Sequence, residues 1–229
     1  MNNLLIECCA NSVQSAINGA QGGANRIELC CSLPSGGLTP KYEEIIKAKE
    51  NLTVPLHILI RPRKGDFIYT HTEFNEMLHD IAFCKDVGCS GVVIGCLNID
   101  KSINKKQTKV LVDSARPMHV TFHRAFDEGN NLEQNLEDVI QCGCDTILTA
   151  GQHDTVNNGI TNLKKLVSLA NNRIKILAGS GLNSTNIKSL YEIGIRNFHL
   201  SGSVKNQKKE LVTDSLLIKA VIDKLKEIV

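Results

Sequence analysis

The sequence predicts a single (β/α)8 TIM barrel that occupies residues 1–229. Three observations support this fold class: eight short apolar runs recur along the chain, amphipathic stretches separate them, and several of these stretches end in glycine. Each apolar run is typical of a buried parallel strand, and each amphipathic stretch is typical of a helix that covers a sheet. Eight such units in 229 residues have the length of one closed barrel.

The predicted strands follow one another at intervals long enough for one helix each. In chain order they cover residues 4–10, 26–31, 55–62, 91–97, 119–126, 146–151, 174–179 and 197–202. The amphipathic stretches include TEFNEMLHDIAFCKDVG and NLEQNLEDVIQCG. Gly88, Gly143 and Gly194 close three of the stretches, as expected for the residue just past the last turn of a helix.

An open, doubly wound sheet is the alternative arrangement for alternating strands and helices. A dinucleotide-binding sheet of that kind carries a GxGxxG turn after its first strand, and this chain has no such turn there. No linker, low-complexity tract or shift in composition divides the sequence. We therefore expect one domain.

The composition argues against several classes of partner. The net charge is +2 and the lysines are scattered, which does not suit a nucleic-acid-binding or membrane-binding surface. No apolar run reaches the roughly 18 residues of a membrane-spanning helix. The first residues have the pattern of a strand and lack the basic segment of a signal peptide. We expect a cytoplasmic protein without nucleic-acid or membrane partners.

Nine cysteines are present, an odd number, and no CxxC pair indicates a zinc ribbon or a thioredoxin-like motif. Most of them lie in apolar surroundings, where a reduced cysteine behaves as a small buried hydrophobe. One spacing occurs twice: Cys9 follows Glu7 by two residues, and Cys30 follows Glu28 by two residues. The repeated spacing makes these four residues candidates for a shared site.

Polar side chains lie near the ends of several predicted strands. Residues two apart on a strand face the same side, so one set faces the barrel interior and the other faces the helices. The predicted inward set consists of Glu7, Cys9, Arg26, Glu28, Cys30, His57, Arg61, Thr121, His123, His199 and Ser201. Burying so many polar groups for stability alone would be costly, so the set indicates a polar pocket for an anionic or metal ligand. For any single member, a structural ion pair or hydrogen bond is the alternative.

An enzyme is one of two candidate functions for such a pocket. Glu7, Glu28, His57, His123 and His199 are the candidates for acid–base catalysis on a small anionic or phosphorylated substrate. They do not specify one reaction, because an isomerase, a lyase and a metal-assisted hydrolase all remain open. No lysine lies near the C-terminal end of a predicted strand, and no GxSxG, HExxH or P-loop pattern occurs. These absences argue against a Schiff-base aldolase and a serine hydrolase.

Loops that follow the predicted strands add candidates for anion binding. The loops after the last two strands of a barrel, with a helix N-terminus, are its usual phosphate site. Here a glycine-rich loop precedes a helix that we expect Asn183 or Ser184 to cap. The anion-binding candidates are Arg61, Arg124, Asp127, Gly179, Ser180, Gly181 and Ser201. Tight turns, and an arginine–aspartate bridge within RPRKGD, are the structural alternatives.

With these residues assembled, the sequence resembles the copper homeostasis protein CutC family. The likeness runs in order from about residue 4 to residue 203. Besides Glu7 and Cys9, it rests on GGANRIELC (22–30), GGLTP (36–40), IRPRKGDF (60–67), VTFHRAFD (120–127), ILTAGQ (147–152) and ILAGSGL (176–182). The resemblance implies a TIM barrel and a cytosolic homo-oligomer that is associated with copper handling and binds Cu(I). It places the copper-linked cysteines on Cys9 and Cys30.

Cu(I) binding is therefore the predicted function, and the small-anion enzyme is the alternative. Cu(I) is a soft ion that prefers thiolates, and adjacent parallel strands lie about 4.8 Å apart. If Cys9 and Cys30 lie level, their sulfurs can flank one ion, while Cys8 and Cys31 face the helices. The chain departs from the family pattern twice: the segment KNQKKELVTDS is short, and Lys64 stands where RPRGGDF is usual.

Overall fold

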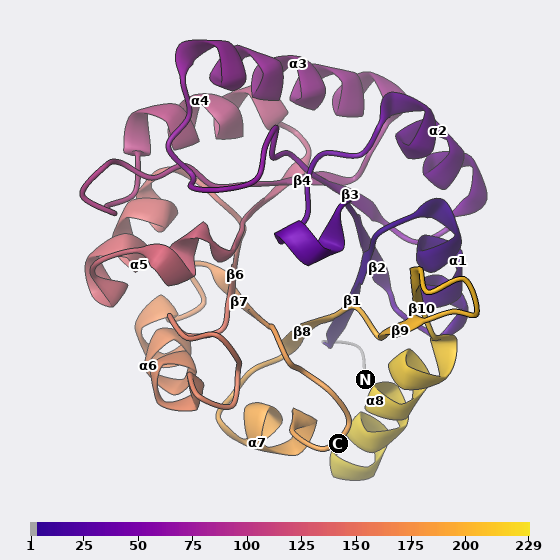
Figure 1. Ribbon diagram of the computed structural model, residues 1–229. Helices are drawn as coiled ribbons and strands as arrows, with labels where there is room; N and C mark the ends of the chain where they lie inside the picture. The colour runs from indigo at the N-terminus through magenta and orange to yellow at the C-terminus, as the bar shows by residue number, and fades with distance from the viewer. Residues whose placement is uncertain (1–3) are drawn as a thin grey trace.

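The computed structural model describes residues 4–229, and in it β1–β8 form a closed parallel barrel in chain order (Figure 1). The strands are β1 (Leu5–Ala10), β2 (Arg26–Leu29), β3 (Leu56–Leu59), β4 (Gly91–Ile94), β5 (His119–Phe122), β6 (Thr146–Thr149), β7 (Lys175–Gly179) and β8 (Asn197–Leu200). β8 pairs with β1, which closes the ring. Every predicted strand is present, so the prediction of a single-domain (β/α)8 barrel is confirmed. Most strands are shorter than the predicted runs, whose last residues form the loops at the carboxyl ends.

Eight helices surround the barrel, as the view along its axis shows (Figure 1). They are α1 (Val13–Gln21), α2 (Tyr42–Asn51), α3 (His71–Val87), α4 (Lys105–Ala115), α5 (Leu132–Gln141), α6 (Ile160–Ala170), α7 (Ile187–Glu192) and α8 (Ser215–Ile228). Their ends follow local chemistry. Thr70 and Glu73 form a capping box at the start of α3, and Gly88 ends that helix with a φ of 77°, a left-handed conformation that glycine adopts without strain.

The predicted cap of α7 is wrong. α7 begins only at Ile187, with Asn186 at the N-cap position, and it is six residues long. The side chain of Asn183 instead accepts hydrogen bonds from the backbone N–H and the hydroxyl of Thr185, which forms a local turn before the helix. The helix therefore begins two or three residues later than predicted.

Two short 3-10 helices and one hairpin complete the fold. The 3-10 helices are η1 (Leu33–Ser35) and η2 (Arg124–Glu128), and the hairpin consists of β9 (Ser203–Lys205) and β10 (Leu211–Thr213). The hairpin occupies the short segment after β8, where no regular structure was predicted. Asn11 and Asn18 donate to the carbonyl oxygens of Leu211 and Thr213 at 3.0 and 2.8 Å, which ties the hairpin to the first βα unit.

Alternation along the strands separates a helix-facing set from an interior set. Cys8 is fully buried on the helix side of β1, where a Cβ added to Gly19 of α1 would lie 2.6 Å from its sulfur. The Cys31 thiol contacts the carbonyl oxygen of Thr39 at 3.2 Å and stays outside the barrel interior. Within β2, the apolar residues Ile27 and Leu29 are also fully buried in the core between the strands and the helices. The interior set forms the candidate site.

Candidate functional site

A cavity of about 300 Å³ opens at the carboxyl ends of the barrel strands. Its polar side chains come from the ends of β1, β2 and β8 and from the loops after β3 and β5. They are Cys9, Glu28, Arg61, His123, Arg124 and His199. Ser180, Gly181, Ser201 and Gly202 line it from the loops after β7 and β8. The cavity therefore lies where barrels of this fold place their chemistry.

Five of the eleven residues in the predicted inward set do not line this cavity. One of the five is Cys30, which is buried behind Cys9, with its sulfur 3.9 Å from the Cys9 sulfur. The other four, Glu7, Arg26, His57 and Thr121, are buried inside the barrel beneath the cavity, and His119 beside them is half-buried. Residues two apart along a strand are separated by about 6.6 Å, so alternate inward residues belong to different layers. The prediction of one pocket that contains all of them is wrong: an inner layer supports an outer layer that faces the cavity.

Glu7 connects the two layers. Its carboxylate accepts a hydrogen bond from Nε of Arg26 and another, at 2.7 Å, from Nδ1 of His199. Burial alone would raise the pKa of Glu7, but Arg26 and His199 lower it well below its usual value. Burial would likewise lower the pKa of His199, but Glu28, Cys9 and Glu7 raise it well above the usual value. Glu7 therefore fixes the orientation of the His199 ring and stabilises its imidazolium form.

Cys9 does not lie level with Cys30, contrary to the prediction. The pairing of β1 with β2 sets Cys9 opposite Glu28 and Glu7 opposite Arg26. Strands tilt in a closed barrel and the pairing is staggered, so Cys30 lies one inward position further along its strand. The Cys9 thiol nevertheless lies between both neighbours, 3.7 Å from Oε1 of Glu28 and 3.9 Å from Sγ of Cys30.

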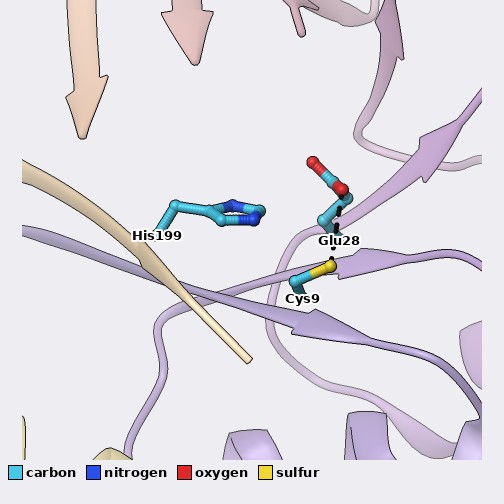
Figure 2. Close-up of side chains that lie close together, drawn as sticks. All are labelled: Cys9, Glu28 and His199. Carbon is cyan, nitrogen blue, oxygen red and sulfur yellow. Dashed lines mark hydrogen bonds between the residues drawn. The ribbon is translucent and has the colours of Figure 1, made fainter. Parts of the chain in front are cut away.

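Three chemically different donors converge at the wall of the cavity. A sulfur of Cys9, a carboxylate oxygen of Glu28 and a ring nitrogen of His199 all lie within 4.8 Å of one another (Figure 2). Cys9 and Cys30 are free thiols. The hydrogen bond to Cys30, followed by burial, raises the pKa of Cys9 well above its usual value. A metal ion that binds there must displace this proton.

Glu28 is the least satisfied carboxyl group of the site. Burial raises its pKa to about 7, although the nearby charge of His199 acts in the opposite direction. Only Oε1 has a partner, the Cys9 thiol, and within residues 4–229 its other oxygen, Oε2, has none. A buried oxygen without a partner at a cavity wall indicates a place where a ligand or water binds.

Arg61 connects two loops at the mouth of the cavity through hydrogen bonds to backbone carbonyl oxygens, and it has no carboxylate partner among the described residues. Its Nη1 donates to the carbonyl oxygens of Ser35 and Gly37 at 3.0 and 3.1 Å, and Nη2 donates to that of Gly65 at 2.7 Å. The guanidinium lies over the ring of Phe67, 4.7 Å from its centre. In the described chain no acidic group lies within 4.0 Å of it. The neighbouring Arg63 differs, since it pairs with carboxylates and keeps its loop in place.

Asp127 and Gly179, both predicted to bind an anion, do not line the cavity. Asp127 accepts hydrogen bonds from Nε of Arg124, from the hydroxyl of Thr149 and from the backbone N–H of Gln152, so its oxygens are occupied. It fixes Arg124 at the rim. A Cβ on Gly179 would lie 3.0 Å from Cδ2 of His199, so this glycine leaves room for the imidazole.

Apolar residues of the cavity were not predicted. They are Leu33, Leu59, Phe67, Leu148, Leu182 and Leu200. Leu59 has the same parity as His57 and Arg61, so alternation along the strand was sufficient to find it. Phe67 enters from a loop, where no periodicity exists to reveal it.

None of the helices between residues 4 and 229 combines the length and the apolar character that a membrane span requires.

Comparisons with known proteins identify one family. The sequence model of the CutC family matches residues 4–204. A relative from Bacteroides fragilis, named as a family protein CutC, is 48% identical over 203 residues, which are 88% of this chain and 81% of the relative. A solved structure of a candidate copper homeostasis protein CutC from Streptococcus agalactiae is 28% identical with a TM-score of 0.82. The match covers 86% of this chain and 98% of that one.

More distant structures share the fold alone. Thiamine phosphate pyrophosphorylase from Pyrococcus furiosus has a TM-score of 0.67 at 14% identity, over 100% of this chain and 98% of that one. The family match spans the whole barrel and includes every residue that lines the cavity. The chain belongs to the CutC family.

Proposed function

We propose that this chain binds one Cu(I) ion through the thiolates of Cys9 and Cys30 and acts in copper homeostasis. The separation of 3.9 Å between their sulfurs supports the proposal. Two ligands that each lie about 2.3 Å from one ion, about 120° apart, are about 4.0 Å from each other. Little movement is needed to place an ion between them. The name of the Streptococcus agalactiae structure also refers to copper homeostasis.

His199 is the proposed third ligand. Its Nδ1 donates to Glu7, so its other ring nitrogen is the one that loses its proton to a binding metal ion. Imidazole suits copper, whereas the carboxylate of Glu28 is a harder donor that soft Cu(I) does not favour. The proposal includes a reducing cytoplasm, because oxidation there would join Cys9 and Cys30 in place of the metal. A homo-oligomer is part of the same proposal, and light scattering on the purified chain would test it.

An anaerobic Cu(I) titration against a competing chelator tests the thiol pair. Cys9→Ser and Cys30→Ser are each expected to weaken Cu(I) binding by more than about 10-fold, since thiolate is the preferred ligand. Cys31→Ser is the matched control, because its thiol lies next to Cys30 in sequence but outside the barrel interior. If the double variant Cys9→Ser/Cys30→Ser binds as tightly as the wild type, the proposed site is wrong.

An enzyme that acts on a small anionic substrate is the second candidate. The observation that favours it is the cavity itself, since two thiol ligands do not require a pocket of about 300 Å³ lined by Glu28, His123 and Arg61. A thermal-shift screen with small carboxylates and phosphosugars tests this candidate. It predicts at least one stabilising compound whose effect is lost in Arg61→Gln.

A further inference from the structure

The cavity contains a buried cation that no anion of the chain neutralises. Arg61 is 6% exposed, and within the described residues no carboxylate forms a salt bridge with its guanidinium. Three carbonyl oxygens satisfy Nη1 and Nη2, but Nε has no partner. Buried charges in proteins are normally paired, because removing them from water is costly. Arg63 and Arg124 near the barrel mouth and Arg26 in the layer beneath all have carboxylate partners, so Arg61 differs from each of them.

A second unpartnered donor faces the same cavity. Nδ1 of His123 accepts the backbone N–H of Ala125 at 3.1 Å, so the ring proton of the neutral imidazole lies on Nε2. This nitrogen is buried and has no partner within residues 4–229. Burial, followed by the charge of Arg61, lowers the pKa of His123 to about 3, which keeps the ring neutral. His123 therefore presents one N–H group with a fixed direction.

Arg61 and His123 flank one apolar ring. The guanidinium of Arg61 lies 4.7 Å from the centre of Phe67, and the imidazole of His123 lies 4.8 Å from the same centre. Both donors line the cavity with Phe67. A ligand in contact with this ring can therefore meet one positive charge and one neutral N–H donor.

Another wall of the cavity offers a different kind of partner. Oε2 of Glu28 is buried and unpartnered in the described chain. A hydroxyl group satisfies a carboxyl group in either protonation state, because it can donate or accept a hydrogen bond. Leu59 and Leu148 supply an apolar surface. A cavity of about 300 Å³ lies at the small end of ligand sites.

We propose that this cavity binds a small hydroxycarboxylate, with the carboxylate at Arg61 and His123 and the hydroxyl at Glu28. This inference rests on the second candidate function, the enzyme, and does not involve copper. A monoanion fits better than a phosphate, because only one of the two arginines at the cavity is unpaired: Asp127 already neutralises Arg124. The short α7 also provides no long helix whose N-terminus would serve a phosphate.

Isothermal titration of the full chain with glycerate tests the inference. Glyceramide, which has the same hydroxyl groups but no charge, and inorganic phosphate are the matched probes. We expect glycerate to bind at least about 10-fold more tightly than either, since a hydrogen bond to a charged group is stronger than one to a neutral group. Equal affinity for glycerate and glyceramide, or tighter binding of phosphate, would overturn the proposal.

Two variants locate the binding. Arg61→Gln removes the cation, and His123→Asn keeps an acceptor for the Ala125 N–H while removing the Nε2 donor. Each is expected to weaken glycerate binding by about 10-fold or more. Arg63→Gln is the control, because Arg63 lies two residues away, pairs with Asp66 and Glu73, and does not line the cavity. If Arg61→Gln does not fold, His123→Asn decides, and unchanged binding in that variant contradicts the proposal.

The outcomes separate binding from catalysis. Glycerate that binds through Arg61 and His123 supports the carboxylate site, whether or not it is converted. Failure of glycerate and of every other carboxylate to bind, with stabilisation by a phosphosugar, rejects the carboxylate site and keeps the enzyme. In either case the Cu(I) titration of Cys9→Ser and Cys30→Ser is unaffected.

Discussion

Oε1 of Glu7 lies 2.7 Å from Nδ1 of His199, and the other oxygen of the same carboxylate accepts from Arg26. Glu7 is fully buried. One anion thus balances two cations inside the barrel and holds the imidazole that faces the cavity.

Glu7→Gln is expected to destabilise the fold strongly. The substitution leaves Arg26 and His199 buried without their anion, and breaking a buried ion pair costs about 3–5 kcal/mol. Urea unfolding at pH 7 measures the change in the free energy of unfolding. Glu137→Gln is the control, because it removes an exposed partner of Arg173, where a loss of at most about 1 kcal/mol is expected. Similar losses in the two variants would contradict this account.

Stability is expected to fall as the pH is lowered from about 6.5 towards 4.5. Burial comes first among the causes that lower the pKa of His57 and His123 to about 3 and that of His119 to about 4, from an ordinary 6.5. In this window the unfolded chain therefore binds protons that the folded chain does not. Glu28 opposes the trend, because its pKa is raised to about 7 and its folded form gains a proton. His199 and Asp80, whose pKa values are also raised, oppose the trend at the upper and lower ends of the window, so the net slope stays below about 2.7 kcal/mol per pH unit.

Urea unfolding at several pH values between 4.5 and 6.5 checks this slope in the wild type and in His57→Gln. Removing one of these three imidazoles is expected to reduce the slope by up to about 1.4 kcal/mol per pH unit. If both proteins show the same slope, His57 is protonated in the folded state as readily as in the unfolded state, which contradicts the prediction.

Gly91→Ala is expected to destabilise the inner layer by about 1–3 kcal/mol through overpacking. A Cβ at this position of β4 would lie 2.5 Å from Nε2 of His57, and His57 is almost completely buried. In the background of His57→Ser, where the imidazole is gone, the same substitution is expected to cost much less. A double-mutant cycle from thermal or urea unfolding measures the coupling, and purely additive losses would exclude the predicted clash.

Cys30 and Glu28, the two neighbours of the Cys9 thiol, are expected to favour different metal ions. Cys30 adds a second soft thiolate, whereas Glu28 and His199 add an oxygen and a nitrogen donor that suit Zn²⁺. Cys30→Ser should therefore weaken Cu(I) binding more than Zn²⁺ binding, and Glu28→Gln should do the reverse. Competition titrations with each metal measure the two ratios. If both variants weaken the binding of both metals equally, Cys30 and Glu28 do not favour different metal ions.

The barrel was predictable because its signal repeats. Eight apolar runs with helical stretches between them occur in one order, and the glycine at position 88 ends a helix where its left-handed φ is needed. The end of α7 nearest the cavity was not predictable, because Asn183 engages Thr185 in a local turn that competes with the cap.

The site was predictable in composition but not in depth. Alternation along the strands found the inward residues, but it does not say that Glu7 and His57 belong to a layer below Glu28 and His123. The same limit applies to the sulfur pair, because the stagger of β1 against β2 comes from closure of the ring and has no local signature. Arg61 is held by hydrogen bonds to loop carbonyl oxygens. These bonds depend on tertiary contacts, so the sequence does not predict them.

The donors of the candidate metal site come from the two ends of the barrel sequence. Cys9 and Glu28 belong to the first two strands, while His199 belongs to the last strand, 190 residues after Cys9. Contacts of such sequence separation form late in folding, since a long loop must be closed before they exist. A chain that has not yet placed β8 beside β1 carries the thiols without the imidazole. Occupancy of the complete donor set is therefore a direct indicator that the ring has closed.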